Sequence, residues 1–296
     1  MPELPDITVY VEALESRLRG AQLQSSRISH PFLTRTFEPP LSALHGRRVV
    51  GVRRVGKRVA LEFEGEHWLV LHLMIAGRLH WFAVGVRPAG RAALASLRFD
   101  RGTLTLTEAG TKRRASLYVF GNREAFAGAD PGGLEVLRAS YEAFRARLRA
   151  ENHTLKRSLT DPHTFSGIGN AYSDEILHRA QLSPTAVTRN LDEDSLRRLH
   201  AASVAVLTEW VQRLRAQTGD AFPEKVTAFR AEMAVHGRFG KPCVTCGATV
   251  QRIRYAESET NYCPRCQTGG RILADRSLSR LLKDDWPRTI DELESR

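Results

Sequence analysis

The sequence predicts an α+β multidomain protein. Its N-terminal part is expected to be an antiparallel β-sandwich with a leading helix, its middle part helical, and its C-terminal part a small cysteine-rich ribbon. Three observations support this prediction: apolar residues repeat with helical spacing over 7–18, short β-rich stretches fill 48–127, and residues 140–236 show helical patterns. The only four cysteines follow, between positions 243 and 266.

Each element is expected from its local pattern. The first helix covers 7–18, and Gly20 is suited to end it. The clearest expected strands are Arg58–Phe63, Trp68–Leu73, Ser96–Phe99 and Thr103–Thr107. A turn-rich break over 130–133 precedes the expected helices Tyr141–Arg149, His153–Thr160, Ala171–Ala180, Glu193–Ala216 and Pro223–Met233. Leu278, Leu281 and Leu282 fit one face of a short tail helix.

The chain carries 44 Lys and Arg against 33 Asp and Glu, which gives a formal net charge of +11. This excess favours a polyanionic partner because neutralised phosphates release counterions, although a solvated basic surface is the alternative. No apolar run reaches the roughly 18 residues that span a bilayer. Acidic residues among the first twenty positions exclude a signal peptide. We therefore expect a soluble, cytoplasmic protein with no membrane partner.

The cysteines form two pairs, Cys243-x-x-Cys246 and Cys263-x-x-Cys266, separated by sixteen residues. Four thiolates at this spacing are typical of a zinc ribbon with one structural Zn²⁺, and iron–sulfur or redox pairs are the alternatives. A segment of this size needs such a metal because its own core is too small. Arg252, Arg254 and Arg265 lie either on a phosphate-contacting face or on an exposed hairpin.

A glycine turn, Gly167-Ile168-Gly169-Asn170, lies between two expected helices. The free backbone N–H groups at a helix N-terminus favour a phosphate. Asn170 either caps the helix, which the residues alone favour, or binds that phosphate. Lys156, on the preceding helix, is either a second phosphate ligand or a surface lysine.

The chain begins Met1-Pro2-Glu3. Removal of Met1 leaves a secondary amine on Pro2, which is a good nucleophile toward an aldehydic carbon. Glu3 is placed to act as acid or base if it is buried. The alternative is a rigid chain start with a helix cap at Asp6.

Four ordered motifs resemble the formamidopyrimidine-DNA glycosylase/endonuclease VIII family over roughly residues 1–270. They are the opening Pro2–Asp6; Gly56-Lys57 with His72–Leu79; Leu155-Lys156 to Asp161 with Gly167–Glu175; and Val235–Arg238 with Cys243 and Tyr262–Gln267. The resemblance implies four segments: a catalytic β-sandwich (1–128), a helix–two-turn–helix domain (138–237), a four-Cys zinc finger (238–270) and an extension (271–296).

The resemblance also implies a monomeric, nucleoid-associated bacterial enzyme of base-excision repair. Such an enzyme acts on oxidised or otherwise damaged bases or abasic sites in double-stranded DNA, as a DNA glycosylase with AP lyase activity. Pro2 is expected to attack the sugar, Glu3 to move protons, Lys57 to hold a phosphate and Glu175 to orient the proline. The implied DNA-binding residues are Lys156, Gly167, Gly169, Asn170, Arg114 and Arg254.

Several positions depart from the family pattern. Ser258, between Glu257 and Glu259, stands where the finger normally carries an arginine, so the usual phosphate grip and a second elimination step are open. Lys112–Ala115 lacks the aromatic of the usual Arg-Arg-Phe wedge. Ile75 stands where a void-filling Met is common, with Met74 beside it, and Asp6 replaces a Glu. These departures indicate a divergent member with altered lesion choice.

Two other functions are open. The altered finger and the incomplete wedge are compatible with a non-catalytic protein that binds damaged or abasic DNA. The zinc ribbon and the positive charge are also compatible with an unrelated nucleic-acid protein in transcription or RNA metabolism.

Overall fold

The computed structural model describes residues 1–86, 93–109, 112–224, 226–227, 230–255, 258–274 and 287–295. The chain divides into two compact units, Met1–Pro131 with Trp210–Thr227, and Gly132–Glu209 with Ala228–Arg296. The first division falls within the turn-rich break at 130–133. No helix in the described residues is long and apolar enough to cross a membrane.

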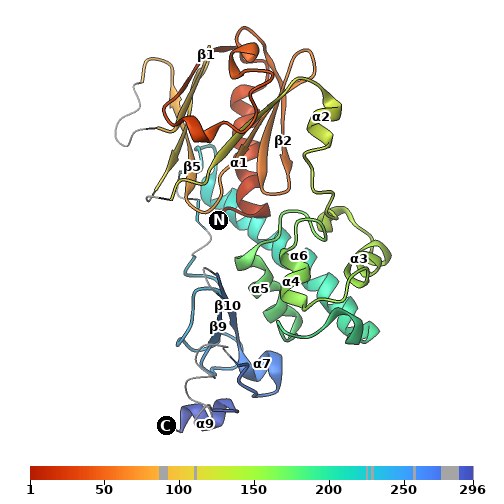
Figure 1. Ribbon diagram of the computed structural model, residues 1–296. Coiled ribbons are helices and arrows are strands. Elements are labelled where there is room, and N and C mark those ends of the chain that lie inside the picture. Colours follow the sequence, from red (N-terminus) through yellow and green to blue (C-terminus); the bar gives the residue numbers. More distant parts are fainter. Residues whose placement is uncertain are drawn as a thin grey trace. The chain divides into compact units, whose positions relative to one another are not determined.

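The first unit holds one long helix and two antiparallel sheets (Figure 1). Its elements are α1 (Leu4–Leu18), β1 (Leu23–Ile28), η1 (Pro31–Leu33), η2 (Leu41–Leu44), β2 (Val49–Val55), β3 (Arg58–Phe63), β4 (His67–His72), β5 (Gly77–Ala83), β6 (Ala95–Phe99), β7 (Gly102–Glu108), β8 (Ser116–Phe120) and α2 (Arg123–Ala127). The four strands predicted in this region are confirmed. The leading helix begins three residues earlier than the apolar spacing indicates.

The two sheets of this unit have the strand orders β1-β6-β7-β5 and β2-β3-β4-β8. One hydrophobic core unites apolar side chains from both sheets with Ile7, Tyr10, Leu14 and Leu18 of α1. These four residues have helical spacing and therefore lie on one face of α1. That face packs into the core between the sheets. The predicted antiparallel sandwich with a leading helix is therefore confirmed.

The second unit contains short helices followed by a two-stranded hairpin. Its elements are η3 (Val136–Arg138), α3 (Tyr141–Arg149), α4 (Leu155–Thr160), α5 (Asn170–Ala180), η4 (Thr188–Asn190), the start of α6 (Glu193–Thr218), β9 (Gln251–Tyr255), β10 (Ser258–Tyr262), α7 (Pro264–Thr268) and α9 (Ile290–Glu294). The last residues of α6, from Trp210, belong to the first unit.

The helix predicted over Pro223–Met233 is wrong for the described residues of that stretch, which form no helix. The pattern mixed two apolar surroundings. Val226 and Phe222 pack into the sandwich core of the first unit, whereas Met233 is buried in the second unit. The apolar residues of this stretch pack into two different cores, so their helical spacing in the sequence does not correspond to one helix. The tail helix expected around Leu278–Leu282 lies outside the described residues.

Candidate functional site

The four cysteines lie together, with their Sγ atoms all within 4.8 Å of one another. The Sγ atoms of Cys246 and Cys263 are 3.4 Å apart, and those of Cys243 and Cys266 are 4.0 Å apart. A tetrahedral Zn²⁺ with Zn–S bonds of about 2.3 Å requires edges of about 3.8 Å. These thiols therefore fit one structural zinc, with no position left open for a substrate.

The hairpin β9–β10 connects the two cysteine pairs, and it gathers opposite charges. The Glu259 carboxylate lies 3.2 Å from Arg252 and 3.6 Å from Arg254, and it also accepts a hydrogen bond from the Asn261 side chain at 2.8 Å. Ser258 is exposed at the start of β10. The Arg254 side chain is 63% exposed, as expected for a DNA-binding residue. It also forms an ion pair with Glu259 on the facing strand, which partly neutralises its charge.

The N-terminal cluster is built around the start of α1. The backbone N–H of Glu3 donates to the Asp6 carboxylate at 2.9 Å, and the Glu3 carboxylate accepts from the backbone N–H of Asp6. Both side chains are buried, and so is Pro2. The helix cap is therefore Glu3 and not Asp6, and this reciprocal pair fixes the Glu3 carboxyl at the start of α1.

The chain terminus in this cluster is electrostatically unusual. Burial lowers the pKa of the Met1 amine from its ordinary value of 8.0; Glu3 and Asp6 act against this effect, and Arg78 and Lys57 add to it. Lys57 stands in the β2–β3 turn beside Gly56, whose φ of 59° is in the left-handed region that glycine adopts without strain. The charges of Glu3 and Lys57 thus both act on the amine at the chain terminus, in opposite directions.

His72, at the end of β4, shares this environment. Burial lowers the pKa of His72 to about 4, and the charges of Arg58 and Lys57 contribute to the shift. The imidazole is therefore neutral near pH 7. The following turn places Met74 at φ 52° and leaves Ile75 53% exposed, so Ile75 is the more prominent of the two side chains. A Cβ on Gly77 would lie 2.3 Å from the Leu73 carbonyl, which makes glycine necessary for this turn.

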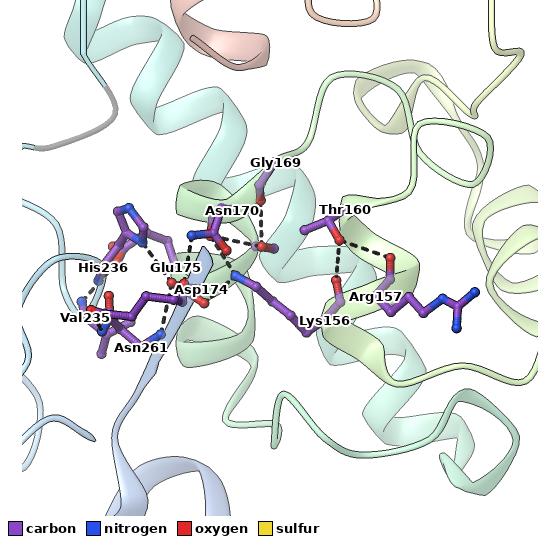
Figure 2. Close-up of polar contacts among 12 residues, drawn as sticks. Lys156, Arg157, Thr160, Gly169, Asn170, Asp174, Glu175, Val235, His236 and Asn261 are labelled. Atoms are coloured by element: carbon purple, nitrogen blue, oxygen red, sulfur yellow. Dashed lines mark hydrogen bonds and ion pairs between the residues drawn. The ribbon is translucent and has the colours of Figure 1, made fainter. Parts of the chain in front are cut away.

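The glycine turn opens α5 in the second unit (Figure 2). Gly167 has φ 81°, and Gly169 is the residue that precedes the first helical residue, Asn170. The expected capping role of Asn170 is wrong because the helix begins one residue too early for it. Its side-chain amide instead donates to the Glu259 carbonyl oxygen at 2.7 Å.

The Lys156 side chain contacts the backbone of Asn170. The hypothesis that both residues bind one phosphate requires them to be close, and their contact with a phosphate stays a prediction. The Lys156 Nζ donates to the Asn170 carbonyl oxygen at 2.7 Å and pairs with Asp174 at 2.5 Å. The Lys156 side chain is only 14% exposed, which excludes the alternative of an ordinary surface lysine. Lys156, Gly169 and Asn170 therefore form one local cluster at the N-terminus of α5, where a helix attracts anions.

Two adjacent carboxylates of α5 anchor later segments of the chain (Figure 2). Glu175 accepts backbone hydrogen bonds from Ala234, Val235 and His236, at 2.7, 2.9 and 3.0 Å. Asp174 accepts from His236 Nδ1 at 2.8 Å and from the Asn261 backbone N–H at 3.1 Å. Glu175 thus has a structural role in the second unit, and its expected role beside the proline stays a prediction.

Arg114, the nearest candidate for a wedge residue, is exposed before β8. Its backbone N–H and that of Ala115 donate to the Glu108 carboxylate, at distances from 2.9 to 3.3 Å. Glu108 therefore fixes the base of this segment and leaves a basic stretch, Lys112–Arg114, at the surface. Its contact with DNA stays a prediction.

Two polar residues of these clusters had no role in the sequence analysis: Asp174, which binds Lys156, and His178, which lies 3.3 Å from Cys243 Sγ. Asp174 lies four residues after Asn170 on the same helix, a spacing that places both on one face, and that periodicity was the one signal available. Cys243 is 65 positions from His178, so no local pattern joins them. For Glu259 the sequence indicated repulsion of a phosphate, and the structure adds its ion pairs with Arg252 and Arg254.

Family comparisons agree with this architecture in three segments. Residues 1–117 match the formamidopyrimidine-DNA glycosylase N-terminal domain, 130–220 its H2TH domain, and 240–269 a zinc finger found in FPG and IleRS. Together with the sandwich, the glycine turn and the four thiols, these matches define a zinc-finger DNA glycosylase of base-excision repair. The chain belongs to the formamidopyrimidine-DNA glycosylase family, which confirms the resemblance found in its motifs.

Relatives align over nearly their whole length. The formamidopyrimidine-DNA glycosylases of Heliobacterium modesticaldum and an Acidovorax species are 32% and 34% identical, over 90% of this chain and 100% and 99% of theirs. An uncharacterized formamidopyrimidine-DNA glycosylase-like protein of Mycobacterium tuberculosis is 41% identical over 151 residues, which cover 51% of this chain and 94% of that protein.

Solved structures give the same result. The Lactococcus lactis FPG (MutM), in complex with a Fapy-dG containing DNA, has a TM-score of 0.79 and 25% identity, over 90% of this chain and 100% of that chain. The wild-type enzyme in complex with an oxidized pyrimidine containing DNA gives a TM-score of 0.78, with the same identity and coverage.

Proposed function

We propose that this protein is a bifunctional DNA glycosylase and AP lyase whose nucleophile is Pro2 after removal of Met1. The observation that carries the proposal is the buried start of α1. There Pro2 and Glu3 are buried, the capping pair fixes the Glu3 carboxyl, and burial lowers the pKa of the Met1 amine one residue away. The same burial would favour the unprotonated, nucleophilic form of a Pro2 amine.

The proposed chemistry has two stages. The Pro2 nitrogen attacks the sugar C1′, the damaged base leaves, and Glu3 protonates the ring oxygen O4′ as the sugar opens to an iminium ion. The iminium acidifies the C2′ proton, whose removal expels the 3′ phosphate and cuts the strand. Hydrolysis of the iminium then releases the enzyme. A second elimination stays open, because Ser258 replaces the usual finger arginine.

The proposed partner is double-stranded DNA that contains a damaged base or an abasic site. Support comes from the relatives, since the Lactococcus lactis structures hold such DNA. In the first unit Lys57 is proposed to hold a phosphate beside the lesion. In the second unit Lys156, Asn170 and the N–H groups near Gly167 and Gly169 are proposed to hold another, while the zinc maintains only the finger. Arg114 and Arg254 are proposed as peripheral DNA contacts.

We propose the four segments inferred from the sequence, 1–128, 138–237, 238–270 and 271–296, with two adjustments: Trp210–Thr227 joins the first unit, and Ile290 joins the core of the zinc ribbon. We propose that a monomer is the working unit, because one chain supplies every residue that the scheme uses. Gel filtration with light scattering tests this point, and a stable dimer would contradict it.

Borohydride trapping tests the nucleophile. Protein whose processed N-terminus has been verified by mass spectrometry is incubated with abasic duplex DNA and borohydride, which reduces an iminium to a stable amine. Wild-type protein is expected to give a covalent complex that maps to Pro2. Pro2→Gly keeps a primary amine and is expected to trap more slowly, and a form that retains Met1 is expected to give no complex that maps to Pro2. An untrapped, correctly processed wild type overturns the proposal.

A second candidate function is binding of damaged or abasic DNA without cleavage. The pairing of Arg252 and Arg254 with Glu259, where the family carries an arginine grip, favours it. This function predicts tight binding of abasic DNA by processed protein, with no strand cut and no trapping after long incubation. Trapping through Pro2 excludes it.

A further inference from the structure

One histidine outside the zinc ribbon reaches its metal-binding thiols. His178 lies on α5, its side chain is buried, and its Nε2 is 3.3 Å from Cys243 Sγ. The sulfurs also accept two backbone N–H groups, from Thr245 to Cys243 and from Cys266 to Cys263, both at 3.4 Å. Among the described residues, His178 is the one side chain other than a cysteine that has a hydrogen bond to these sulfurs.

The charge of the site explains why such a donor matters. Four thiolates around Zn²⁺ carry a net charge of −2, and Cys243 and Cys263 are buried. Buried charge is costly unless N–H groups compensate it. An imidazole with a proton on Nε2 donates to the Cys243 thiolate and holds that sulfur in the ligand position.

We propose that His178 is a positioning residue of the zinc site, which holds Cys243 through an Nε2–H···S hydrogen bond and thereby ties the ribbon to α5. The donor and the acceptor are 65 positions apart in the sequence, so the bond joins two distant parts of the chain within the second unit. This inference concerns zinc retention and stands independently of the proposed lyase chemistry. It also gives α5 two roles, since the same helix begins at the glycine turn.

Three variants of the zinc-loaded full chain separate the hydrogen bond from simple packing. His178→Phe keeps an aromatic side chain and removes the donor, whereas His178→Gln keeps an N–H donor. His200→Phe is the matched control, because the His200 ring lies tilted against Phe144 with ring centroids 5.0 Å apart, and among the described residues it has no hydrogen bond to a cysteine. Zinc affinity is measured by competition with a colorimetric chelator, and folding is checked by circular dichroism.

Loss of a group that orients a metal ligand typically weakens metal binding by about 10-fold to 100-fold. We expect His178→Phe to lose zinc affinity by about 10-fold, with His178→Gln and His200→Phe near the wild type. In the Co²⁺-substituted protein, the thiolate-to-metal charge-transfer band is expected to shift in His178→Phe alone. Unchanged affinity in a folded His178→Phe, or equal weakening in the Phe and Gln variants, overturns the proposal.

Discussion

Asp174 joins three parts of the second unit: α4, the segment at His236 and the strand β10. Its side chain has no exposed surface, and it binds Lys156, His236 and the backbone of Asn261. A buried carboxylate is tolerated only with such partners. Lys156 therefore stabilises the buried Asp174 carboxylate, in addition to its proposed role at a phosphate.

A double-mutant cycle tests this pair. Asp174→Asn leaves Lys156 largely buried without its counter-charge, so the free energy of unfolding is expected to fall by about 3 kcal/mol. Lys156→Met alone is expected to be destabilising for the reciprocal reason. The double variant is expected to lose clearly less than the sum of both, as measured by urea denaturation at fixed free zinc. Strict additivity would show that the two charges do not interact.

At the scale of elements, the hairpin β9–β10 determines how much positive charge the finger presents. Arg252 and Arg254 come from one strand, and Glu259 faces them from the other. In the register, Glu259 is directly opposite Arg254, so the pairing follows from the strand alignment. The hairpin thus reduces its own attraction for phosphate.

Glu259→Gln removes this charge and keeps an oxygen that can accept from Asn261. We expect tighter binding of duplex DNA at low salt, with the slope of log K against log salt steeper by about one unit. Fluorescence anisotropy across a salt series measures both quantities. Glu124→Gln, an exposed carboxylate on α2, serves as the control. The same slope for both variants and the wild type would count against the charge-sharing account.

Local patterns predicted the elements where one surface receives all the apolar residues. The helix α1 and the strand β6 are examples, since the alternating residues Ala95, Leu97 and Phe99 of β6 lie in the same core as one face of α1. The pattern failed over 223–233, where Val226 and Met233 belong to different units. It also failed at Asn170, because a shift of one residue in the helix start changes which side chain is the cap.

At the scale of the whole molecule, the described residues at the end of the chain, 287–295, pack against the zinc ribbon. The family match to the finger ends at residue 269, yet Ile290 is fully buried with Cys243, Val250 and Cys263. Its helix α9 lies beside α7, where Arg265 pairs with Asp291 at 3.0 Å (Figure 1). The Ile290 backbone N–H donates to the Gly270 carbonyl oxygen at 2.8 Å, and this hydrogen bond joins the start of α9 to the end of the finger.

Ile290→Ala tests this contribution. Removal of a buried isoleucine side chain usually costs about 2–5 kcal/mol, and the small ribbon has few other apolar contacts to compensate. We expect faster zinc loss in chelator and a lower melting temperature of the second unit. Val244→Ala, at a position that is 64% exposed on the same ribbon, should change neither. Equal behaviour of the two variants would place α9 outside the ribbon's core.

The candidate site was predictable where its residues are close in the sequence. Pro2 with Glu3, the two cysteine pairs and the glycine turn are all short motifs. Contacts such as Asp174 with Asn261, 87 positions apart, arise only when the chain has folded. Patterns in a single sequence predict residues that act together over short distances along the chain. The tertiary fold determines which backbone and side-chain groups form hydrogen bonds or ion pairs with each charged group.

The Glu175 carboxylate has a consequence for amide hydrogen exchange. The segment 234–236 is neither helix nor strand, so its N–H groups would ordinarily exchange with solvent deuterium quickly. Because all three N–H groups donate to Glu175, each can exchange only when its hydrogen bond to that carboxylate breaks. Peptides covering these residues should therefore take up deuterium as slowly as a regular element, and Glu175→Ala should remove that protection selectively.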